Sequence, residues 1–448
     1  MNGETTPTAP VDPGPARTWR VSPNLALDRV VAERRAAGEP LVHLGFGEAR
    51  LPVLPELVER LTAGATRTHY GEVAGDAAVR RGGAAYFARR GLPTRPGQVV
   101  LAPGSKPLLA ALFAALDGDV LLPNPSWVTY APQATLFGRR VHRIPIPDRC
   151  GGVPEPEALR QVLHGLRRAD GGTRAGALVL TVPDNPTGTT AAPDLVREVC
   201  ELAGDEGVTV LSDEIYRDLP HSPDRPFLSP ASVAPEHTVV LTGLSKSLAL
   251  GGWRIGLARF PAGSRGRRLR DRVLSVASEI WSTPPGPMQE VAAYALAEPP
   301  PVRARLAASA RLHGVVAAAV HALLVAHGAR CRPPDAGFYV YPDFEPLRGE
   351  LARHGVRDSA SFQEHLLKQA GVAVLGGHHF GDTATALRFR AATSMLYGED
   401  AEQRTAALHS ADPLRLPWIA GQLRALDAAF AALSSPGGRS RSPHRRPA

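Results

Sequence analysis

Short apolar runs alternate with helical stretches between about residues 99 and 260, and this alternation limits the fold more than any other feature of the sequence. The runs occupy residues 99–102, 120–122, 178–182, 208–211, 238–242 and 256–260. Between two of them, Leu195, Val196, Val199 and Leu202 recur at the spacing of one helical face. Continuous apolar strands that alternate with helices predict an α/β fold, in which helices cover both faces of a mostly parallel sheet.

The segments on either side of this region predict a second, smaller α+β domain. A helix is expected over 24–38, and an Ala-rich helical stretch over 302–328 leads to FYVYPDF, a helix near 359–370, the strand ALRFRAAT and a last helix within 411–434. We therefore expect a disordered lead at 1–20, an N-terminal arm with part of the small domain at 21–60, a large domain at 61–290, a small C-terminal domain at 291–434 and a basic disordered tail at 435–448.

Composition and charge exclude several classes of protein. The net charge of +8 is partly explained by four arginines in the terminal run RSRSPHRRPA, and no recognition motif accompanies it, so nucleic-acid binding is not expected. No uninterrupted run of about 18 apolar residues predicts a membrane span, and the N-terminus lacks the order of a secretory signal. Three distant cysteines and the absence of metal-ligand spacing indicate a cytoplasmic protein without a metal site.

Four polar segments lie at the ends of predicted strands or just beyond them, namely PGSK at 103–106, DNPTG at 184–188, SDEIY at 212–216 and SKSLALGGWR at 245–254. Each has an ordinary explanation when it is taken by itself: a strand-to-helix turn, a Pro-Gly turn, a helix cap or a solvated lysine. Because ligands bind at the carboxyl ends of strands in such sheets, all four are expected to border one site.

Taken together, these segments resemble the fold-type I pyridoxal-phosphate enzymes of the class I/II aminotransferase group. The resemblance extends through LGFGEA, Tyr70 with the following VAGDAAVR, PSWVTY, GFYVYPDF and LRFRAATS, and so runs from about residue 22 to 434. It implies a homodimer with shared active sites and pyridoxal 5′-phosphate as cofactor. The implied reaction moves an amino group between an α-amino acid and a 2-oxo acid in a ping-pong cycle.

The resemblance also implies roles around the cofactor ring. Lys246 is expected to hold the cofactor as a Schiff base and then to act as the general base. Asp213 is expected to pair with the pyridine nitrogen, whereas Asn185 and Tyr216 are expected to donate to the ring's 3′ oxygen. Trp127 is expected to stack on the ring. Lys246, Asp213 and Tyr216 are the expected catalytic residues.

The cofactor phosphate is expected to lie at the turn before the helix of residues 105 onward. The resemblance assigns the backbone N–H groups of Ser105 and Lys106 to the phosphate, with Arg254 as its counter-ion and the hydroxyl of Ser245 as a further contact. Tyr70 is expected to reach the phosphate from the partner subunit.

The substrate is expected to meet Gly47, Trp127, Asn185 and an arginine that binds the α-carboxylate. Arg388 is the position matched by the resemblance, and Arg390, two residues further along the same predicted strand, is the competing candidate. His378 and His379, in the loop LGGHHFG, are a further possible contact with substrate.

Departures from the family pattern leave the substrate open. They are GEAR at 47–50, Asp184 in DNPTG, Gly243 before the lysine, and a long connection over 397–418. The same cofactor set also serves β- or γ-elimination, replacement or carbon–carbon bond formation, which is the alternative activity. A cofactor-binding regulator of transcription is a third hypothesis, but the lead of about 20 residues has no room for a helix-turn-helix.

Overall fold

The structure is a computed structural model that describes residues 21–168 and 174–434. The expected lead at 1–20 and the expected tail at 435–448 lie outside the described residues. The first helix, α1 (Pro23–Ala36), confirms the helix expected over 24–38. It begins at a proline, because proline's fixed φ suits the first helical position and no backbone donor is lost there.

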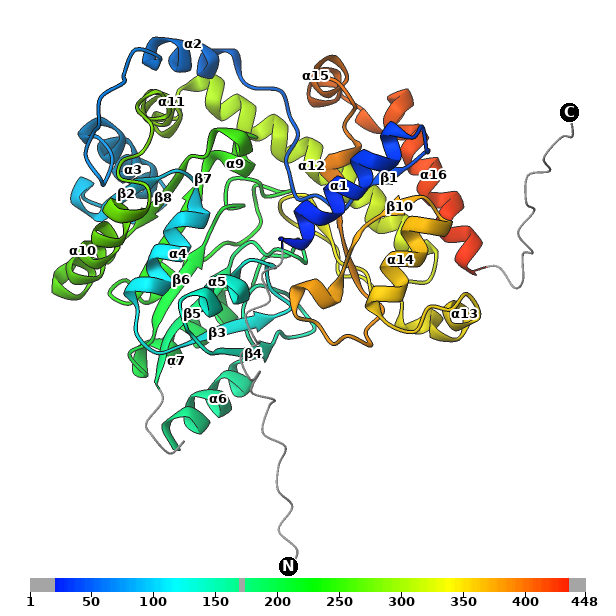
Figure 1. The fold of residues 1–448 in the computed structure, drawn as a ribbon, viewed down its shortest axis with the longest axis horizontal. Coiled ribbons are helices and arrows are strands. Elements are labelled where there is room, and N and C mark those ends of the chain that lie inside the picture. Colours follow the sequence, from blue (N-terminus) through cyan, green and yellow to red (C-terminus); the bar gives the residue numbers. More distant parts are fainter. Residues whose placement is uncertain (1–20, 169–173, 435–448) are drawn as a thin grey trace, which may run out of the picture.

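A seven-stranded sheet forms the centre of the larger part of the molecule, with the strand order β2-β8-β7-β6-β5-β3-β4 (Figure 1). All neighbouring strands are parallel except β8, which runs antiparallel to β2 and β7. The strands are β2 (Val99–Ala102), β3 (Asp119–Asn124), β4 (Val141–Pro145), β5 (Ala175–Thr181), β6 (Thr209–Asp213), β7 (Thr238–Gly243) and β8 (Gly256–Arg259). Each of the six apolar runs forms one of these strands, whereas the edge strand β4 was missed because only its Ile144 is buried.

Helices cover both faces of this sheet, as predicted. Val100 packs toward the face with α4, α5 and α10, whereas its neighbour Leu101 packs toward the face with α3 and α11. Further along the sheet, α6 and α7 cover this second face. The helices of this part are α2 (Pro55–Gly64), α3 (Ala77–Arg89), α4 (Ser105–Ala115), α5 (Tyr130–Leu136), α6 (Pro156–Arg168), α7 (Pro193–Asp205), α8 (Pro230–Val233), α9 (Leu244–Ser247), α10 (Gly263–Ile280) and α11 (Gly286–Ala297).

The C-terminal residues form a second hydrophobic core around small sheets. Strands β11 (Leu375–Gly376), β12 (Phe389–Ala392) and β9 (Tyr339–Val340) pair antiparallel in that order, and β1 (Val42–His43) pairs in parallel with β10 (Val372–Ala373). The helices here are α12 (Pro300–Ala326), α13 (Arg348–Arg353), α14 (Ser359–Gln369), α15 (Ala401–His409) and α16 (Pro417–Ser434). Short 3-10 helices occupy Pro96–Gln98, Gly251–Trp253, Glu345–Leu347, Gly377–Phe380, Thr393–Leu396 and Pro413–Arg415.

Two elements of this C-terminal part qualify the sequence expectations. The connection over 397–418 contains α15, whose Ala407 and Leu408 join the same core as Leu312 of α12. By length and composition, α12 is apolar enough to cross a membrane, with a mean hydropathy of 1.5. However, its Leu312, Val316 and Val320 lie in the core, and the core helix of a soluble protein meets the same criterion. The domain boundaries at 60 and 290 stay a prediction.

Candidate active site

A cavity of about 500 Å³ lies at the carboxyl ends of the central strands, where the four polar segments meet. Thr181 at the end of β5 pairs with Asp213 at the end of β6. Ten of the predicted site residues line this cavity: Gly47, Ser105, Lys106, Trp127, Asn185, Asp213, Tyr216, Ser245, Lys246 and Arg254. Its volume is within the range of about 300–1,000 Å³ that is usual for small-molecule sites.

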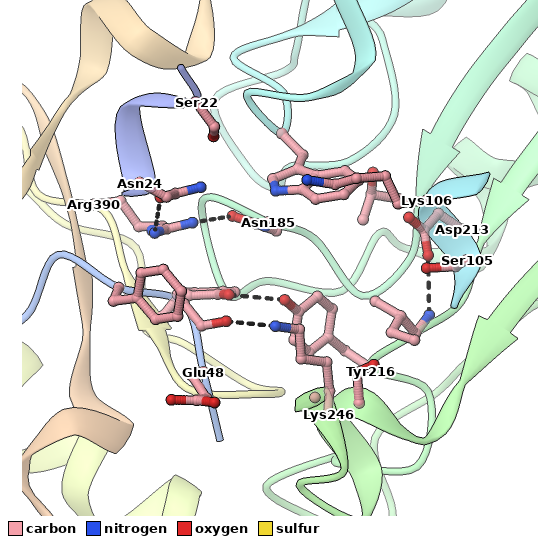
Figure 2. Close-up of a pocket in the computed structure, with 18 of the residues that line it drawn as sticks. Ser22, Asn24, Glu48, Ser105, Lys106, Asn185, Asp213, Tyr216, Lys246 and Arg390 are labelled. Atoms are coloured by element: carbon pink, nitrogen blue, oxygen red, sulfur yellow. Dashed lines mark hydrogen bonds between the residues drawn. The ribbon is translucent and has the colours of Figure 1, made fainter. Parts of the chain in front are cut away.

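Lys246 lies on α9, directly after β7, and its amine points into the cavity (Figure 2). Its Nζ donates a hydrogen bond to the carbonyl oxygen of Gly47. Burial, together with the positive charges of Arg390 and Arg254, lowers the pKa of Lys246 to about 8. A lysine in this environment supplies a neutral amine, which is the nucleophilic and basic form, near physiological pH.

Asp213 ends β6, and two hydrogen-bond donors hold its carboxylate in place. The hydroxyl of Tyr130 donates to Asp213 Oδ2 at 2.7 Å, and the same hydroxyl lies 2.9 Å from Thr181 Oγ1. The backbone N–H of Ile215 donates to Oδ1. Burial raises the pKa of Asp213 to about 6. The carboxylate is therefore ready to accept a proton or a strong hydrogen bond from a cationic ring nitrogen.

The turn before α4 is shaped as a cradle for an anion. Gly104 has φ +99°, and a Cβ there would lie 2.2 Å from Arg254 Nη2. A Cβ on Gly256 would lie 2.3 Å from the backbone nitrogen of Ser105. Arg254 itself adopts the left-handed conformation, with φ 56°, and Ser105 begins α4 without a side-chain cap. Glycines thus bring an arginine fork and a helix N-terminus together, which is the arrangement that favours a phosphate.

Arg390 lies at the opposite side of the cavity and is 1% exposed. Its Nη1 donates to Asn185 Oδ1 at 3.1 Å, and its Nη2 donates to Asn24 Oδ1 at 3.0 Å and to the carbonyl oxygen of Gly45 at 2.9 Å. Among residues 21–168 and 174–434 it forms no ion pair, and its Nε has no hydrogen-bond partner. A buried cation without a counter-ion marks a binding site for an anion.

Arg388, the expected carboxylate-binding residue, lies outside the cavity, whereas its competing candidate Arg390 lines it. The Arg388 guanidinium donates to Asp382 and to Asp343, each at 3.2 Å. Strand β12 begins only at Phe389, and Arg388 forms a bridge with Asp343 instead. Leu387, Phe389 and Ala391 pack into one core, so Arg388 and Arg390 share the other face of the strand. The two arginines differ because Asp382 and Asp343 hold Arg388 outside the cavity.

A pair of tyrosines adjoins Lys246 and Arg390. The hydroxyl groups of Tyr216 and Tyr339 lie 2.8 Å apart, and the guanidinium carbon of Arg390 lies 4.7 Å from the centre of the Tyr339 ring. A Cβ on Gly47 would lie 2.4 Å from the Tyr339 hydroxyl, so only glycine fits there. Tyr339 was not predicted as a site residue, although FYVYPDF was recognised, because the segment offers Tyr341 as well.

Two departures from the family pattern have structural explanations away from the substrate. Asp184 accepts hydrogen bonds from the backbone nitrogen and the hydroxyl of Thr187, at 3.2 and 2.6 Å, and so closes the turn of DNPTG. Burial raises the pKa of Asp184 to about 7. A Cβ on Gly243 would lie 2.6 Å from the carbonyl oxygen of Ile255, which leaves no room for a larger residue.

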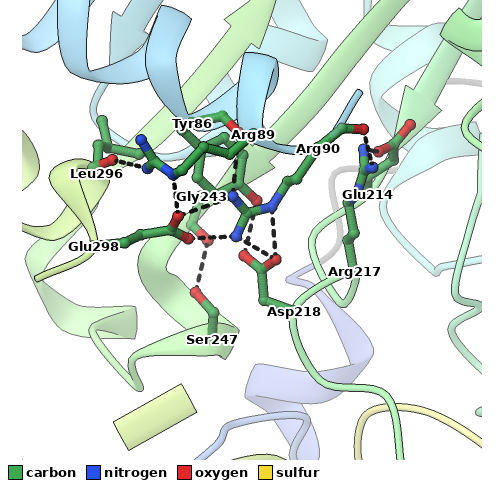
Figure 3. Close-up of polar contacts among 10 residues, drawn as sticks. All are labelled: Tyr86, Arg89, Arg90, Glu214, Arg217, Asp218, Gly243, Ser247, Leu296 and Glu298. Carbon is green, nitrogen blue, oxygen red and sulfur yellow. Dashed lines mark hydrogen bonds and ion pairs between the residues drawn. The ribbon is translucent and has the colours of Figure 1, made fainter. Parts of the chain in front are cut away.

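An ion-pair network fixes the loop that carries Asp213 and Tyr216. Arg90 lies between Asp218 and Glu298, and its Nη2 donates to Asp218 Oδ1 at 2.7 Å (Figure 3). Figure 3 also shows Arg217 donating to the buried Glu214, at 2.7 Å. Ion pairs therefore anchor the loop at Glu214, Arg217 and Asp218, and these contacts keep the neighbouring site residues in place.

Tyr70 and the histidine pair lie outside the cavity. Tyr70 is 85% exposed in the single chain, so its role toward a partner subunit stays a prediction. His378 and His379 have ring centres 3.9 Å apart, and His378 Nδ1 lies 3.0 Å from Ser359 Oγ. Neither histidine lines the cavity.

Comparison with known proteins agrees with this site. Residues 39–396 match the family described as aminotransferase class I and II. The aspartate aminotransferase of Geobacillus stearothermophilus is 30% identical over 402 residues, which cover 86% of this chain and 95% of that protein. The aspartate/prephenate aminotransferase of Cereibacter sphaeroides is 31% identical, with 81% and 90% covered.

A solved structure of the aspartate aminotransferase of Thermus thermophilus with maleate superimposes with a TM-score of 0.74 at 29% identity. The match covers 87% of this chain and 95% of that one. These relatives are aminotransferases, so elimination, replacement and carbon–carbon bond formation are not favoured. The chain belongs to the class I and II aminotransferase family, whose members use pyridoxal phosphate to transfer amino groups.

Proposed function

We propose that this pyridoxal-phosphate-dependent aminotransferase binds the α-carboxylate of its substrates at Arg390 and moves protons with Lys246. In two half-reactions, the donor amino acid leaves as a 2-oxo acid, and an acceptor 2-oxo acid then takes up the amino group. The observation that carries the proposal is the buried guanidinium of Arg390, which has no carboxylate partner among the described residues. Its planar fork matches a carboxylate in two parallel hydrogen bonds.

The residues present fit the cofactor. Gly104 and Gly256 leave the space that a Cβ would fill, beside Arg254 and the N-terminus of α4, and this cradle suits the phosphate. Asp213 suits the ring nitrogen because its buried carboxylate is stabilised by a proton or a cationic donor. The bound cofactor supplies an aldehyde that reacts with amines and a ring that withdraws electrons from the substrate's α-carbon.

The remaining contacts orient the ring. We propose that Asn185 and Tyr216 donate to its 3′ oxygen, that Trp127 covers one face, and that Ser245 adds a hydroxyl contact to the phosphate. All four side chains line the same cavity, which supports these assignments.

Lys246 has the features of a proton carrier. Its lowered pKa, about 8, leaves a substantial neutral fraction at neutral to mildly alkaline pH. The Gly47 carbonyl accepts from Nζ and so directs the amine into the cavity. The substrate carboxylate at Arg390 would set the α-carbon beside this amine, because Gly47 lies against both Lys246 and Arg390.

We propose aspartate-like acids as the first donors to test, because the relatives include aspartate aminotransferases. Lys106 supports this choice: the residue lines the cavity, and its amine lies 5.3 Å from the centre of the Trp127 ring and forms no ion pair with the described residues. Burial and the charge of Arg254 lower its pKa. Glu48 also lines the cavity and would disfavour an acidic side chain on its side, so donors with neutral side chains belong in the same panel.

Assembly and cellular context extend the proposal. We propose a cytoplasmic homodimer of amino acid biosynthesis in which Tyr70 of one chain reaches the phosphate of the other. The 85% exposure of this large side chain supports a contact outside its own chain. We also propose a large domain at 61–290 and a small domain at 291–434, with residues 21–60 as an N-terminal arm and part of the small domain.

The test is the half-reaction. Cofactor-loaded protein is mixed with single amino acids while the visible spectrum of the cofactor and the mass of the products are followed. Loss of the coloured form together with the matching 2-oxo acid supports the proposal and names the donor. A product formed without transfer of the amino group, such as one from which the side chain has been eliminated, would contradict the proposal. Sedimentation velocity tests the dimer independently.

A further inference from the structure

The guanidinium of Arg390 is held between two amides that come from distant parts of the chain. Asn185 accepts from Nη1, and Asn24, the second residue of α1, accepts from Nη2 at 3.0 Å. Figure 2 shows Asn24 and Asn185 on either side of the Arg390 fork. Both terminal nitrogens that a carboxylate would use are therefore occupied by amide oxygens.

Carboxylate binding must change the partner of Asn24. Guanidinium N–H groups only donate, so in this structure the Asn24 oxygen faces Arg390. The two hydrogens of Nη2 go to Asn24 and to the Gly45 carbonyl, so a substrate carboxylate that takes parallel hydrogen bonds from Nη1 and Nη2 displaces one of these two acceptors. The Asn24 amide can turn away by rotation of its side chain, whereas the Gly45 carbonyl belongs to the backbone. The other side of the Asn24 amide carries two N–H donors, and a turn about the last side-chain bond presents them to the arriving carboxylate.

The position of α1 supports this role. Leu27 and Val31 seat the helix in the cluster that contains Val128 and Phe380. The centre of the Phe380 ring lies 5.0 Å from the guanidinium carbon of Arg390, so α1 and Arg390 both pack against Phe380. The first turn extends over the cavity, where Ser22, Asn24 and Leu25 line it.

We propose that Asn24 is a substrate-binding residue: its amide holds the Arg390 fork in the free enzyme and donates to the α-carboxylate in the complex. This inference rests on the proposed function, because it takes Arg390 as the carboxylate site. The role concerns the α-carboxylate and not the side chain of the substrate. It links occupation of the site to the first turn of α1.

The test compares Asn24→Ala, Asn24→Asp and the wild-type enzyme, all loaded with cofactor. Loss of one hydrogen bond to a charged group predicts a rise of about 10- to 100-fold in KM for the amino acid, with kcat changed less than about threefold. Asn24→Asp places a carboxylate against Arg390, which competes with the substrate, so its KM rises further. Arg29→Ala is the matched control on α1, since the Arg29 side chain is 79% exposed.

Two probes separate the carboxylate contact from a general effect on α1. The dissociation constant of 2-methylaspartate, which lacks the α-hydrogen, is measured by calorimetry and rises about 10- to 100-fold in Asn24→Ala. β-Alanine, which corresponds to aspartate without its α-carboxylate, binds the wild-type and Asn24→Ala enzymes equally weakly.

The outcomes are distinct. An unchanged dissociation constant in Asn24→Ala, or an equal loss of affinity in Arg29→Ala, overturns the inference. Binding of 2-methylaspartate without turnover of any amino acid overturns the proposed function and leaves the role of Asn24 decided by the binding data. No binding of 2-methylaspartate to the wild-type enzyme overturns aspartate-like acids as donors, and the same comparison then uses the 2-methyl analogue of the donor that the half-reaction names.

Discussion

Replacing Arg390 by alanine gives the most direct test of the active site. The side chain is 1% exposed and aims both terminal nitrogens at the cavity. A bound carboxylate would take two charge-assisted hydrogen bonds, each worth about 1.5–3 kcal/mol. Their loss amounts to about 3–6 kcal/mol, and each 1.4 kcal/mol is about tenfold, so kcat/KM should fall about 10²- to 10⁴-fold. Arg390→Lys keeps the charge but loses the planar fork, so its kcat/KM should lie between those of the wild type and Arg390→Ala.

The neighbouring Arg388 provides a matched control in the same segment. Its guanidinium pairs with Asp343 and Asp382 outside the cavity, and the side chain is 38% exposed. The Asp343 and Asp382 side chains are 16% and 6% exposed, so removal of the guanidinium leaves two largely buried carboxylates with fewer donors. Arg388→Ala should therefore lower the melting temperature and leave kcat/KM within about threefold of wild type.

The assay is the single-turnover half-reaction of each variant with the donor found for the wild-type enzyme. Cofactor content and the thermal melt are measured first, so that loss of folding or of cofactor is not mistaken for loss of substrate binding. If Arg388→Ala loses activity while Arg390→Ala keeps it, the assignment of the carboxylate site is wrong and the sequence-based choice of Arg388 is restored.

Three further predictions follow from the site. Burial favours the neutral amine of Lys246, so cofactor-free protein should capture pyridoxal phosphate about tenfold faster per pH unit up to a pH of about 8, where the rate levels off. Stopped-flow absorbance measures this rate, and a midpoint near pH 10.5 would contradict the lowered pKa. Gly47→Ala would place a Cβ 2.4 Å from the Tyr339 hydroxyl, and this overpacking costs about 1–3 kcal/mol. The KM for the donor should therefore rise about 10- to 100-fold, whereas an unchanged KM would mean that Tyr216 and Tyr339 move aside. Tyr130→Phe removes the hydroxyl that donates to Asp213, so the cofactor should bind about 10- to 100-fold more weakly in a fluorescence titration, and equal affinity would deny Tyr130 any part in positioning Asp213.

The large sheet and its ligand edge were predictable from the sequence because both depend on local patterns. Buried parallel strands need apolar side chains on both faces, and this gives the continuous runs that mark β2, β5, β6 and β7. The chain leaves each run at the same edge of the sheet, so the polar residues that follow were expected to meet. Asp213 and Lys246 do meet in one cavity, although β6 and β7 are separated by a long connection.

Residues whose partners lie far along the chain could not be predicted in this way. Arg388 and Arg390 have the same side chain and differ by two positions, and only the acidic neighbours of Arg388 separate them. Asn24 meets Arg390 across 366 residues of sequence, and no local pattern near α1 encodes that contact. Tyr130 lies in PSWVTY beside the recognised Trp127, yet its bond to Asp213 depends on how α5 packs against β3 and β4.

The balance of charge in the cavity explains why these distant residues belong together. Four lysine and arginine side chains line it against two carboxylates, so the protein alone leaves an excess of positive charge in a largely buried space. Arg254 faces the cradle at α4 and Arg390 faces the opposite side, with Lys246 between Arg390 and Ser105 in Figure 2. Burying such cations is costly unless anions complete the site. A phosphate at one end and a carboxylate at the other satisfy both arginines at once, and they leave the amine of Lys246 facing the atoms between them.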